Sequence, residues 1–338
     1  MPIEFILPFS KISKKDVRLA GGKGASLGEM SQAGIPVPPG FVVLATAFDR
    51  FLHETGLEVD IEAQLKKVNY KDVNSVDKYS AVIRDLIHRA KMPRDLQSEI
   101  MNAYANLVSG QRQIVNNKAV TSHKLSAISQ LPFYVAVRSS ATAEDSTQAS
   151  WAGELETYLN TTEKDLLRYV KDCWSSLFTP RAIFYRREKK MHKAKVSVAV
   201  VVQAMVQSEI SGVAFTVHPV TKDRNQMIIE AGYGLGEAIV SGQITPDSYI
   251  IDKKNLSLLD INVAEQTRQL IGLVKGGNKW QAVAKKDGAK QKLTGQQIIE
   301  LAKICVNIEQ HYKFPCDIEW AYYKGKFYIT QSRPITTL

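Results

Sequence analysis

The stretch that decides the fold is residues 314–338, which read FPCDIEWAYYKGKFYITQSRPITTL. Apolar and polar side chains alternate on both sides of Lys324 and Gly325, a pattern that predicts two β-strands joined by a turn. Four polar residues of these strands are odd-numbered: Asp317, Glu319, Gln331 and Arg333. They share one face only if the connection has an odd number of residues, for instance a bulged turn with Gly325 in the left-handed conformation.

In that arrangement Glu319 lies opposite Gln331, and Asp317 lies opposite Arg333. The other face of the predicted hairpin carries Ile318, Trp320 and Tyr328. Carboxylate and amide oxygens are hard ligands suited to a Mg²⁺ ion that also holds phosphate oxygens. An arginine on the same face can bind a phosphate through two hydrogen bonds. On the pattern alone, a half-exposed hairpin with ordinary polar residues outside stays open as the alternative.

Composition limits the class of protein. With 338 residues and 44% hydrophobic composition, the chain can bury a substantial core, and we expect two lobes. Since no apolar run approaches transmembrane length and no signal peptide is recognisable, we expect no membrane partner. Three unpatterned cysteines indicate a reduced, cytoplasmic setting. The net charge of +10 is dispersed among acids without an aromatic-spaced basic stripe, so we expect an anionic nucleotide or an acidic partner and no nucleic acid.

A glycine-rich loop, residues 20–28 (AGGKGASLG), follows a short predicted strand and opens a predicted helix. Glycines let the backbone approach a phosphate, the helix N-terminus favours negative charge, and Lys23 adds a cation. The loop is not a Walker loop, because the spacing before the lysine differs and no Ser or Thr follows it directly. An ordinary turn is the alternative interpretation.

A second candidate phosphate-binding stretch is residues 134–145, YVAVRSSATAED. An apolar strand delivers Arg138, and the small hydroxyl residues after it predict a flexible loop whose N–H and O–H groups can cover anionic oxygens. A Ser/Thr turn after a strand is the alternative. Elsewhere, the pattern predicts a charged helical excursion at about 60–107, an irregular loop at 109–130, and strands at 196–206, 211–217 and 226–231.

Together these stretches resemble the nucleotide-binding domain that phosphoenolpyruvate synthases share with pyruvate phosphate dikinases and rifampicin phosphotransferases, an ATP-grasp fold. The resemblance covers nearly the whole chain in order, through GGKGASLGEM, GIPVPPGF, AVRSSATAEDSTQASWAGELETYL, SGVAFTVHPVT, EAGYGLGEAIVSGQITPD and DIEW…YITQSRP. The closing QSRPITTL is most similar to the rifampicin enzymes, whereas HPVT and SGQITPD are more similar to the synthases. The resemblance implies an α+β fold with lobes at about residues 1–194 and 195–338 and the nucleotide between them.

The resemblance also implies a role for each matching residue. The catalytic, phosphate-holding residues would be Lys23, Arg138 and Arg333. The mobile loop over the phosphates would include Ser139, Ser140, Ala141 and Thr142. The segment bordering the adenine would be Gln203, Ala204, Met205 and Val206. The Mg²⁺ ligands would be Glu319 and Gln331. Two further candidates for the nucleotide site are Glu230 and Asp317.

The implied activity is ATP- and Mg²⁺-dependent transfer of a phosphate-containing group to a histidine on a swivelling domain or separate subunit, as in phosphoenolpyruvate synthesis from pyruvate. In that family the β-phosphate is attacked and AMP is released. Relatives carry the acceptor histidine in a glycine-rich, Ser-His-containing segment, and none of the six histidines here sits in one. We therefore expect an ATP-binding half of a phosphotransferase. The same half-reaction serving a rifamycin-like antibiotic, and a nucleotide-binding regulatory subunit without turnover, are the alternatives.

Overall fold

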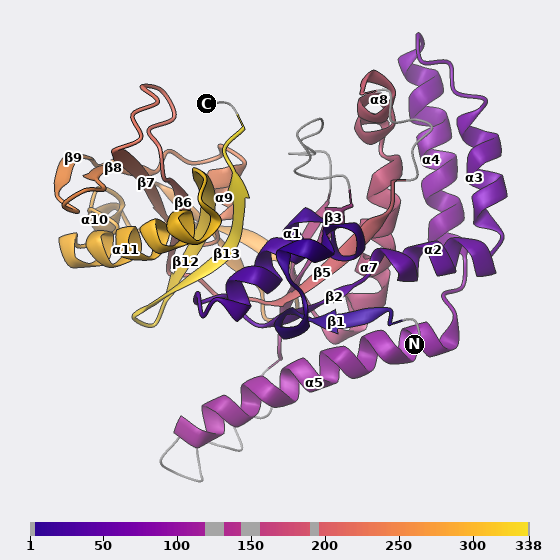
Figure 1. Ribbon diagram of the computed structural model, residues 1–338, viewed down its shortest axis with the longest axis horizontal. Helices are drawn as coiled ribbons and strands as arrows, with labels where there is room; N and C mark the ends of the chain where they lie inside the picture. Colours follow the sequence, from indigo (N-terminus) through magenta and orange to yellow (C-terminus); the bar gives the residue numbers. More distant parts are fainter. Residues whose placement is uncertain (1–3, 119–131, 143–155, 190–195, 337–338) are drawn as a thin grey trace. The chain divides into compact units, whose positions relative to one another are not determined.

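The computed structural model describes residues 4–118, 132–142, 156–189 and 196–336 (Figure 1). Helices and antiparallel strands mix along the chain, which confirms the expected α+β class. The chain forms two compact units. Unit 1 comprises Met1–Gly28, Pro39–Ala204 and Val274–Gly276, and unit 2 comprises Glu29–Pro38, Met205–Leu273 and Gly277–Leu338. This division differs from the expected one at 194/195 in two ways. Unit 1 continues to Ala204, and two short segments are exchanged, since Glu29–Pro38 belongs to unit 2 and Val274–Gly276 belongs to unit 1.

Unit 1 is built on a five-stranded antiparallel sheet in the order β1-β2-β5-β3-β4. Its strands are β1 (Ile6–Pro8), β2 (Gly40–Val43), β3 (Val135–Ala141), β4 (Thr157–Thr161) and β5 (Val198–Ala204). Its helices are most of α1 (Val17–Gln32), α2 (Ala45–Glu54), α3 (Leu57–Leu65), α4 (Val73–Arg89), α5 (Arg94–Lys118), α7 (Leu166–Ser175) and α8 (Pro180–Glu188).

The core of unit 1 lies between this sheet and helices α2 and α7, which pack on β5. Trp174 of α7 is fully buried and stacks on Phe48 and Phe51 of α2, with ring centroids 5.5 and 5.0 Å apart. The central strand β5 is buried on both faces except at its last residue. That double burial explains the continuous apolar run from which the sequence predicted a strand here.

The helical excursion is confirmed by α3, α4 and α5 (Figure 1). The expected irregular loop from residue 109 is wrong for residues 109–118, because α5 continues to Lys118. The end of this helix is polar in sequence, so it lacks the apolar spacing on which a helix prediction depends. Residues 119–130 of the expected loop lie outside the described residues.

Unit 2 contains a six-stranded antiparallel sheet in the order β13-β12-β6-β7-β8-β9, and a separate β10–β11 ribbon. The strands of the large sheet are β6 (Ile210–Phe215), β7 (Gln226–Tyr233), β8 (Asp247–Asp252), β9 (Leu258–Asn262), β12 (Cys316–Tyr323) and β13 (Lys326–Pro334). The remaining elements are β10 (Arg268–Gly272), β11 (Asn278–Ala282), α9 (Glu237–Val240), α10 (Lys285–Gly288) and α11 (Gly295–Tyr312).

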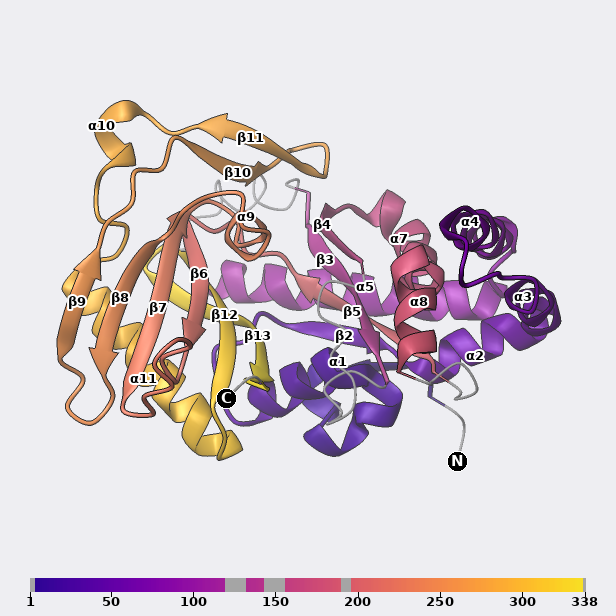
Figure 2. The same cartoon turned by 90° about the horizontal axis from the view of Figure 1, so that it is seen from above.

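Helix α11 covers one face of the large sheet and packs on β7 and β12 (Figure 2). Its buried residues recur at helical spacing, as expected for an amphipathic helix. The sheet residues on that face are mostly apolar and closely packed, among them Ile229, Tyr249, Ile318 and Trp320, each at most 1% exposed. Two fully buried polar residues, Thr216 and Asp247, lie on the same face. Since side chains alternate along a strand, the residues that alternate with these lie on the opposite face. No helix in the described ranges is long and apolar enough to cross a membrane.

Candidate functional site

The β12–β13 hairpin pairs its polar residues as the sequence predicted. Glu319 lies opposite Gln331, and Asp317 lies opposite Arg333. Gly325 is left-handed, as expected, with φ of 77°. Residues that lie directly opposite one another on antiparallel strands project to the same face. The four polar side chains therefore share one face of the unit 2 sheet.

This register requires one extra, unpaired residue in the hairpin, and that residue does not lie in the turn. Lys324 and Gly325 form a two-residue connection with φ of 48° and 77°, as in a type I′ turn. The register instead shifts by a bulge farther along, where Trp320 pairs with Ile329 and Thr330 is the extra residue. One expectation is wrong as a result: Tyr328 pairs with Ala321 on the polar face, and does not join Trp320.

Two rows of side chains cross this polar face. Val213 of β6 pairs with Glu319 on one side and with Glu230 on the other. The first row is Gln331, Glu319, Val213 and Glu230, and the second is Arg333, Asp317, Phe215 and Ile228. The sequence reasoning identified the polar members and missed the apolar ones. The alternation of Ser211, Val213 and Phe215 with smaller residues was the signal that could have revealed them.

Asp317 and Arg333 form an ion pair in the second row. The Oδ2 atom of Asp317 accepts from Nε of Arg333 at 2.9 Å and lies 2.8 Å from its Nη2. Burial raises the pKa of the Asp317 carboxyl and the nearby Glu319 adds to this, whereas Arg333 opposes it. Burial also raises the pKa of Glu230, with a further contribution from Asp317. The face thus concentrates carboxylates that gain from a nearby cation.

The donor set on this face fits a Mg²⁺ ion shared with a phosphate ligand. Among the described residues, no group of three or more His, Cys, Asp or Glu could hold a metal ion. Mg²⁺ characteristically takes one or two carboxylates and fills its other positions with water and substrate phosphates. A carboxylate at Glu319 beside an amide oxygen at Gln331 matches that requirement, and a closed structural metal site does not fit here.

In unit 1, the glycine-rich loop lies at a break within α1. Gly21 has φ of 68° and ψ of 173°, so the helix is interrupted there. A Cβ atom at Gly21 would lie 2.6 Å from the carbonyl carbon of Ser140, so only glycine fits. The Ser140 hydroxyl donates to the carbonyl of Ala20 at 2.9 Å and accepts from the N–H of Gly24 at 3.2 Å. These contacts fasten the loop that carries Lys23 to strand β3.

Arg138 lies two residues before Ser140 on β3 and is 8% exposed. Strand alternation places both side chains on the same face of the unit 1 sheet. The structure therefore brings Arg138 to the face on which the glycine-rich loop is fastened, and Lys23 is half-buried within that loop. Two cationic residues far apart in sequence come from neighbouring segments of one unit.

Comparison with known proteins identifies the family. Residues 17–338 match the family described as "Pyruvate phosphate dikinase, AMP/ATP-binding domain". The chain belongs to this family. It is 46% identical over 99% of its length to a probable phosphoenolpyruvate synthase of Methanocaldococcus jannaschii, and 41% identical over 100% to a phosphoenolpyruvate synthase of Pyrococcus furiosus. It is 37% identical over 99% to a rifampicin phosphotransferase of Bacillus cereus. The resemblance noted in the sequence is confirmed.

The chain spans only part of these relatives, covering 27%, 44% and 36% of their respective lengths. The α+β fold described above is that of the ATP-grasp-like AMP/ATP-binding domain of this family. What the relatives do as whole proteins therefore involves further polypeptide beyond the part that matches.

One part of the predicted nucleotide site in this AMP/ATP-binding domain needs correction. Ser139, Ser140 and Ala141 are strand residues of β3 and are at most 1% exposed, so they do not belong to a mobile loop. Thr142 follows the strand, and its N–H and hydroxyl both donate to the carbonyl of Ser197. The sequence suggested a loop because small hydroxyl residues favour turns, but here their hydroxyls bond to backbone groups of segments that are distant in sequence. Residues 143–155 lie outside the described residues.

The segment expected to border the adenine begins within β5. Gln203 is 2% exposed and pairs with Gly40 and Ala136, and the N–H of Ala204 donates to Pro39 at 2.8 Å. Met205 and Val206 follow the strand, and within the described ranges their backbone N–H groups donate to no protein acceptor. The backbone N–H groups of Met205 and Val206 are therefore available to hydrogen-bond a base, whereas Gln203 and Ala204 are paired within unit 1.

The sequence reasoning missed Glu156. Its carbonyl accepts from the N–H of Ser139 at 3.1 Å and from its hydroxyl at 2.8 Å. Its carboxylate pairs with Arg84 at 2.7 Å and accepts from the Tyr158 hydroxyl. Glu156 thereby fixes the end of β3 next to the candidate Arg138. The available signal was the spacing of Glu156 and Tyr158, which places both on one face of a strand-like segment.

Proposed function

We propose that this chain binds ATP with Mg²⁺ and acts as the ATP-binding half of a phosphoenolpyruvate synthase-like phosphotransferase. The phosphate-containing group is passed to a histidine on a partner domain or chain, and pyruvate is handled outside this chain. The observation that carries the proposal is the polar face of the unit 2 sheet, where Glu319 lies opposite Gln331 and Asp317 opposite Arg333. Membership of an AMP/ATP-binding family and the names of the relatives support it.

In unit 2, Glu319 and Gln331 are the proposed ligands of Mg²⁺, which supplies positive charge against the ATP phosphates when bound. Arg333 is the proposed phosphate-binding residue. Its ion pair with Asp317 holds the guanidinium in one orientation, which limits the entropy lost when a phosphate binds. Glu230 continues the row of Glu319 and adds negative charge near the metal ligands. These roles require alignment and charge neutralisation, which are the main needs of phosphoryl transfer.

In unit 1, Lys23 and Arg138 are the proposed cationic contacts to phosphate oxygens. The glycine at position 21 and the Ser140 hydroxyl hold the Lys23 loop against β3, so the loop is shaped before any ligand arrives. Met205 and Val206 are the proposed backbone contacts to the adenine edge, since their N–H groups donate to no acceptor in the described ranges.

The second candidate is the same half-reaction serving phosphorylation of a rifamycin. It is favoured by the relative named rifampicin phosphotransferase, at 37% identity over nearly the whole chain. The two candidates share every residue discussed above and differ only in the final acceptor. A regulatory subunit without turnover would bind nucleotide and transfer nothing.

MgATP is expected to raise the melting temperature of the chain. A ligand that binds only the folded state stabilises it by about 2.7 kcal/mol at a concentration of 100 times its Kd. The measurement is a thermal melt with ATP and Mg²⁺, with ATP and EDTA as the control for the metal. A folded protein whose melting temperature does not move at millimolar MgATP would contradict the proposed function in every version.

Alone, the chain is expected to release little AMP from ATP, because the acceptor histidine is supplied by a partner. Adding the histidine-bearing domain of a phosphoenolpyruvate synthase should yield AMP, orthophosphate and an acid-labile phosphohistidine on that domain, since attack on the β-phosphate transfers both outer phosphates and water then removes the γ-phosphate. A partner with its acceptor histidine replaced by asparagine is the matched control. Rapid labelling of a histidine of this chain would show the half-enzyme proposal to be wrong, whereas nucleotide binding without transfer to any partner would favour the regulatory alternative.

A further inference from the structure

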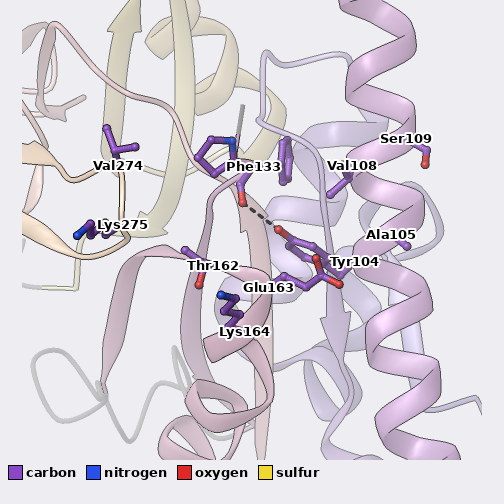
Figure 3. Close-up of a pocket in the computed structure, with 11 residues that line it drawn as sticks. Tyr104, Ala105, Val108, Ser109, Phe133, Thr162, Glu163, Lys164, Val274 and Lys275 are labelled. Carbon is purple, nitrogen blue, oxygen red and sulfur yellow. Dashed lines mark hydrogen bonds between the residues drawn. The ribbon is translucent and has the colours of Figure 1, made fainter. Parts of the chain in front are cut away.

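A pocket of about 720 Å³ lies in unit 1, outside the residues proposed for ATP (Figure 3). It is lined by parts of α5, the segment before β3, the segment after β4, and residues 274 and 275. Its volume falls in the range of small-molecule sites, which are typically apolar with a few polar groups that orient the ligand. Neither the sequence motifs nor the proposed phosphotransfer uses any of its residues.

The apolar wall of the pocket is rigidly built. The Tyr104 hydroxyl donates to the carbonyl of Phe133 at 2.8 Å, as the dashed line in Figure 3 marks. The two rings meet edge to face, with centroids 6.2 Å apart and an interplanar angle of 70°. Val108, one turn further along α5, adds an aliphatic side chain to this wall. Aromatic rings fixed in this way present a preformed apolar surface to a ligand.

The lip of the pocket is also fixed in place. The Tyr134 hydroxyl donates to the carbonyl of Val274 at 2.7 Å. Gly276, at φ of +90°, packs so closely that a Cβ there would lie 3.0 Å from Cγ2 of Thr162 and 3.1 Å from the carbonyl oxygen of Asn160. Despite these constraints Val274 is 80% exposed. An anchored segment therefore holds an apolar side chain in solvent at the pocket edge, where a ligand would cover it.

The charged side chains at the rim of the pocket favour an anionic ligand over a cationic one. Lys164 and Lys275 both line the pocket and are exposed, and the one acidic lining residue is Glu163. Within the described ranges, neither lysine takes part in an ion pair or a hydrogen bond. The Thr162 hydroxyl already donates to Asp165 at 3.1 Å, so it offers no donor to a ligand. The other polar side chains at this rim are the Ser109 hydroxyl and the Glu163 carboxylate, so the two ammonium groups leave the rim with a net positive charge.

We propose that this pocket binds a small aromatic molecule that carries a negative charge. The flat apolar body would lie against Phe133, Val108 and Val274, and the anionic group would be held between the ammonium groups of Lys164 and Lys275. This proposal does not depend on the proposed phosphotransfer, because none of its residues is assigned to ATP or Mg²⁺.

The test uses two dyes of similar shape, the anionic 8-anilinonaphthalene-1-sulfonate and the neutral N-phenyl-1-naphthylamine, titrated by fluorescence against the full chain. Ala105→Trp fills the pocket from an exposed position of α5, so the fold should tolerate it, and it should abolish binding of both dyes. Asn106→Trp is the matched control, since Asn106 is the exposed neighbour that does not line the pocket.

The charge requirement is tested by the double variant Lys164→Ala with Lys275→Ala. At low salt it should weaken sulfonate dye binding on the order of tenfold, with the loss shrinking at high salt, and leave the neutral dye unchanged. Lys66→Ala with Lys67→Ala removes two exposed lysines of unit 1 away from the pocket and should change neither. Undiminished sulfonate binding in Ala105→Trp would overturn the site, and undiminished sulfonate binding in the Lys164 and Lys275 variant would overturn its preference for anions.

Discussion

Glu319→Gln is expected to lower the Mg²⁺-dependent transfer rate by about 100-fold or more while the chain stays folded, because losing one well-aimed electrostatic contact typically costs that much. The substitution keeps the shape and one oxygen of the side chain but removes the charge offered to Mg²⁺. Glu319 is half-buried on the polar face, away from the apolar layer under α11, so little packing is lost. The measurements are partner phosphorylation across a Mg²⁺ titration and a thermal melt.

Glu300→Gln is the matched control, because Glu300 is an exposed carboxylate on α11 and the helix covers the opposite face of the sheet. It should leave both transfer and Mg²⁺ response unchanged. If Glu319→Gln transferred at the wild-type rate with the wild-type Mg²⁺ response, Glu319 would be no metal ligand. A lowered melting temperature without a change in rate would identify the hairpin as a structural element only.

Arg333→Lys separates the phosphate contact from the metal contact. A lysine keeps the charge but loses the planar fork, so transfer should fall while the dependence on Mg²⁺ stays nearly intact. The ion pair of Arg333 with Asp317 implies a cost in stability as well. The Asp317 side chain is 14% exposed, and its Oδ2 atom contacts both Nε and Nη2 of Arg333. A lysine has one ammonium group and can make only one of these two contacts. We therefore expect a small fall in melting temperature alongside the loss of rate.

The hairpin shows how far the sequence could go. The shared parity of Asp317, Glu319, Gln331 and Arg333 allowed their pairing to be predicted on the condition that the hairpin contains one extra residue, because side chains alternate along regular strands. The position of the bulge could not be predicted, since a turn with an extra residue and a bulge at Thr330 give the same register for these four residues. The side chains between the turn and the bulge distinguish the two, since Tyr328 lies on the polar face and Ile329 lies opposite Trp320 on the other.

The serine run after Arg138 shows where local reasoning failed. Small hydroxyl residues favour turns because their side chains bond nearby backbone. The partners here are distant in sequence, since Ser140 bonds to Ala20 and Gly24 more than a hundred residues away. A single sequence carries no signal of such a contact. The same holds for the two units, whose exchange of short segments depends on tertiary packing and on no local pattern.

Gly212→Ala is expected to destabilise unit 2 by roughly 3 kcal/mol or more, at or above the usual cost of overpacking a core. Gly212 lies in β6 between Trp320 and Ala231, on the face that α11 covers. An added Cβ would lie 2.7 Å from Cζ2 of Trp320 and 2.8 Å from the backbone carbon of Glu230. Trp320 is 1% exposed, and the atoms of Glu230 near the added Cβ belong to the backbone. Neither neighbour can move away from the Cβ without disturbing the packing of the sheet.

The displacement should also reach the candidate site, because Glu230 belongs to the row that contains Glu319. Urea denaturation measures the stability, and MgATP binding to the folded fraction measures the effect on the site. Gly110→Ala in α5 is the control: a Cβ there meets nothing within 4 Å, and replacing a helical glycine should stabilise by about 0.5–1 kcal/mol. A Gly212→Ala protein as stable as the wild type would contradict the close packing of β6 against β7 and Trp320 on which the geometry of the polar face depends.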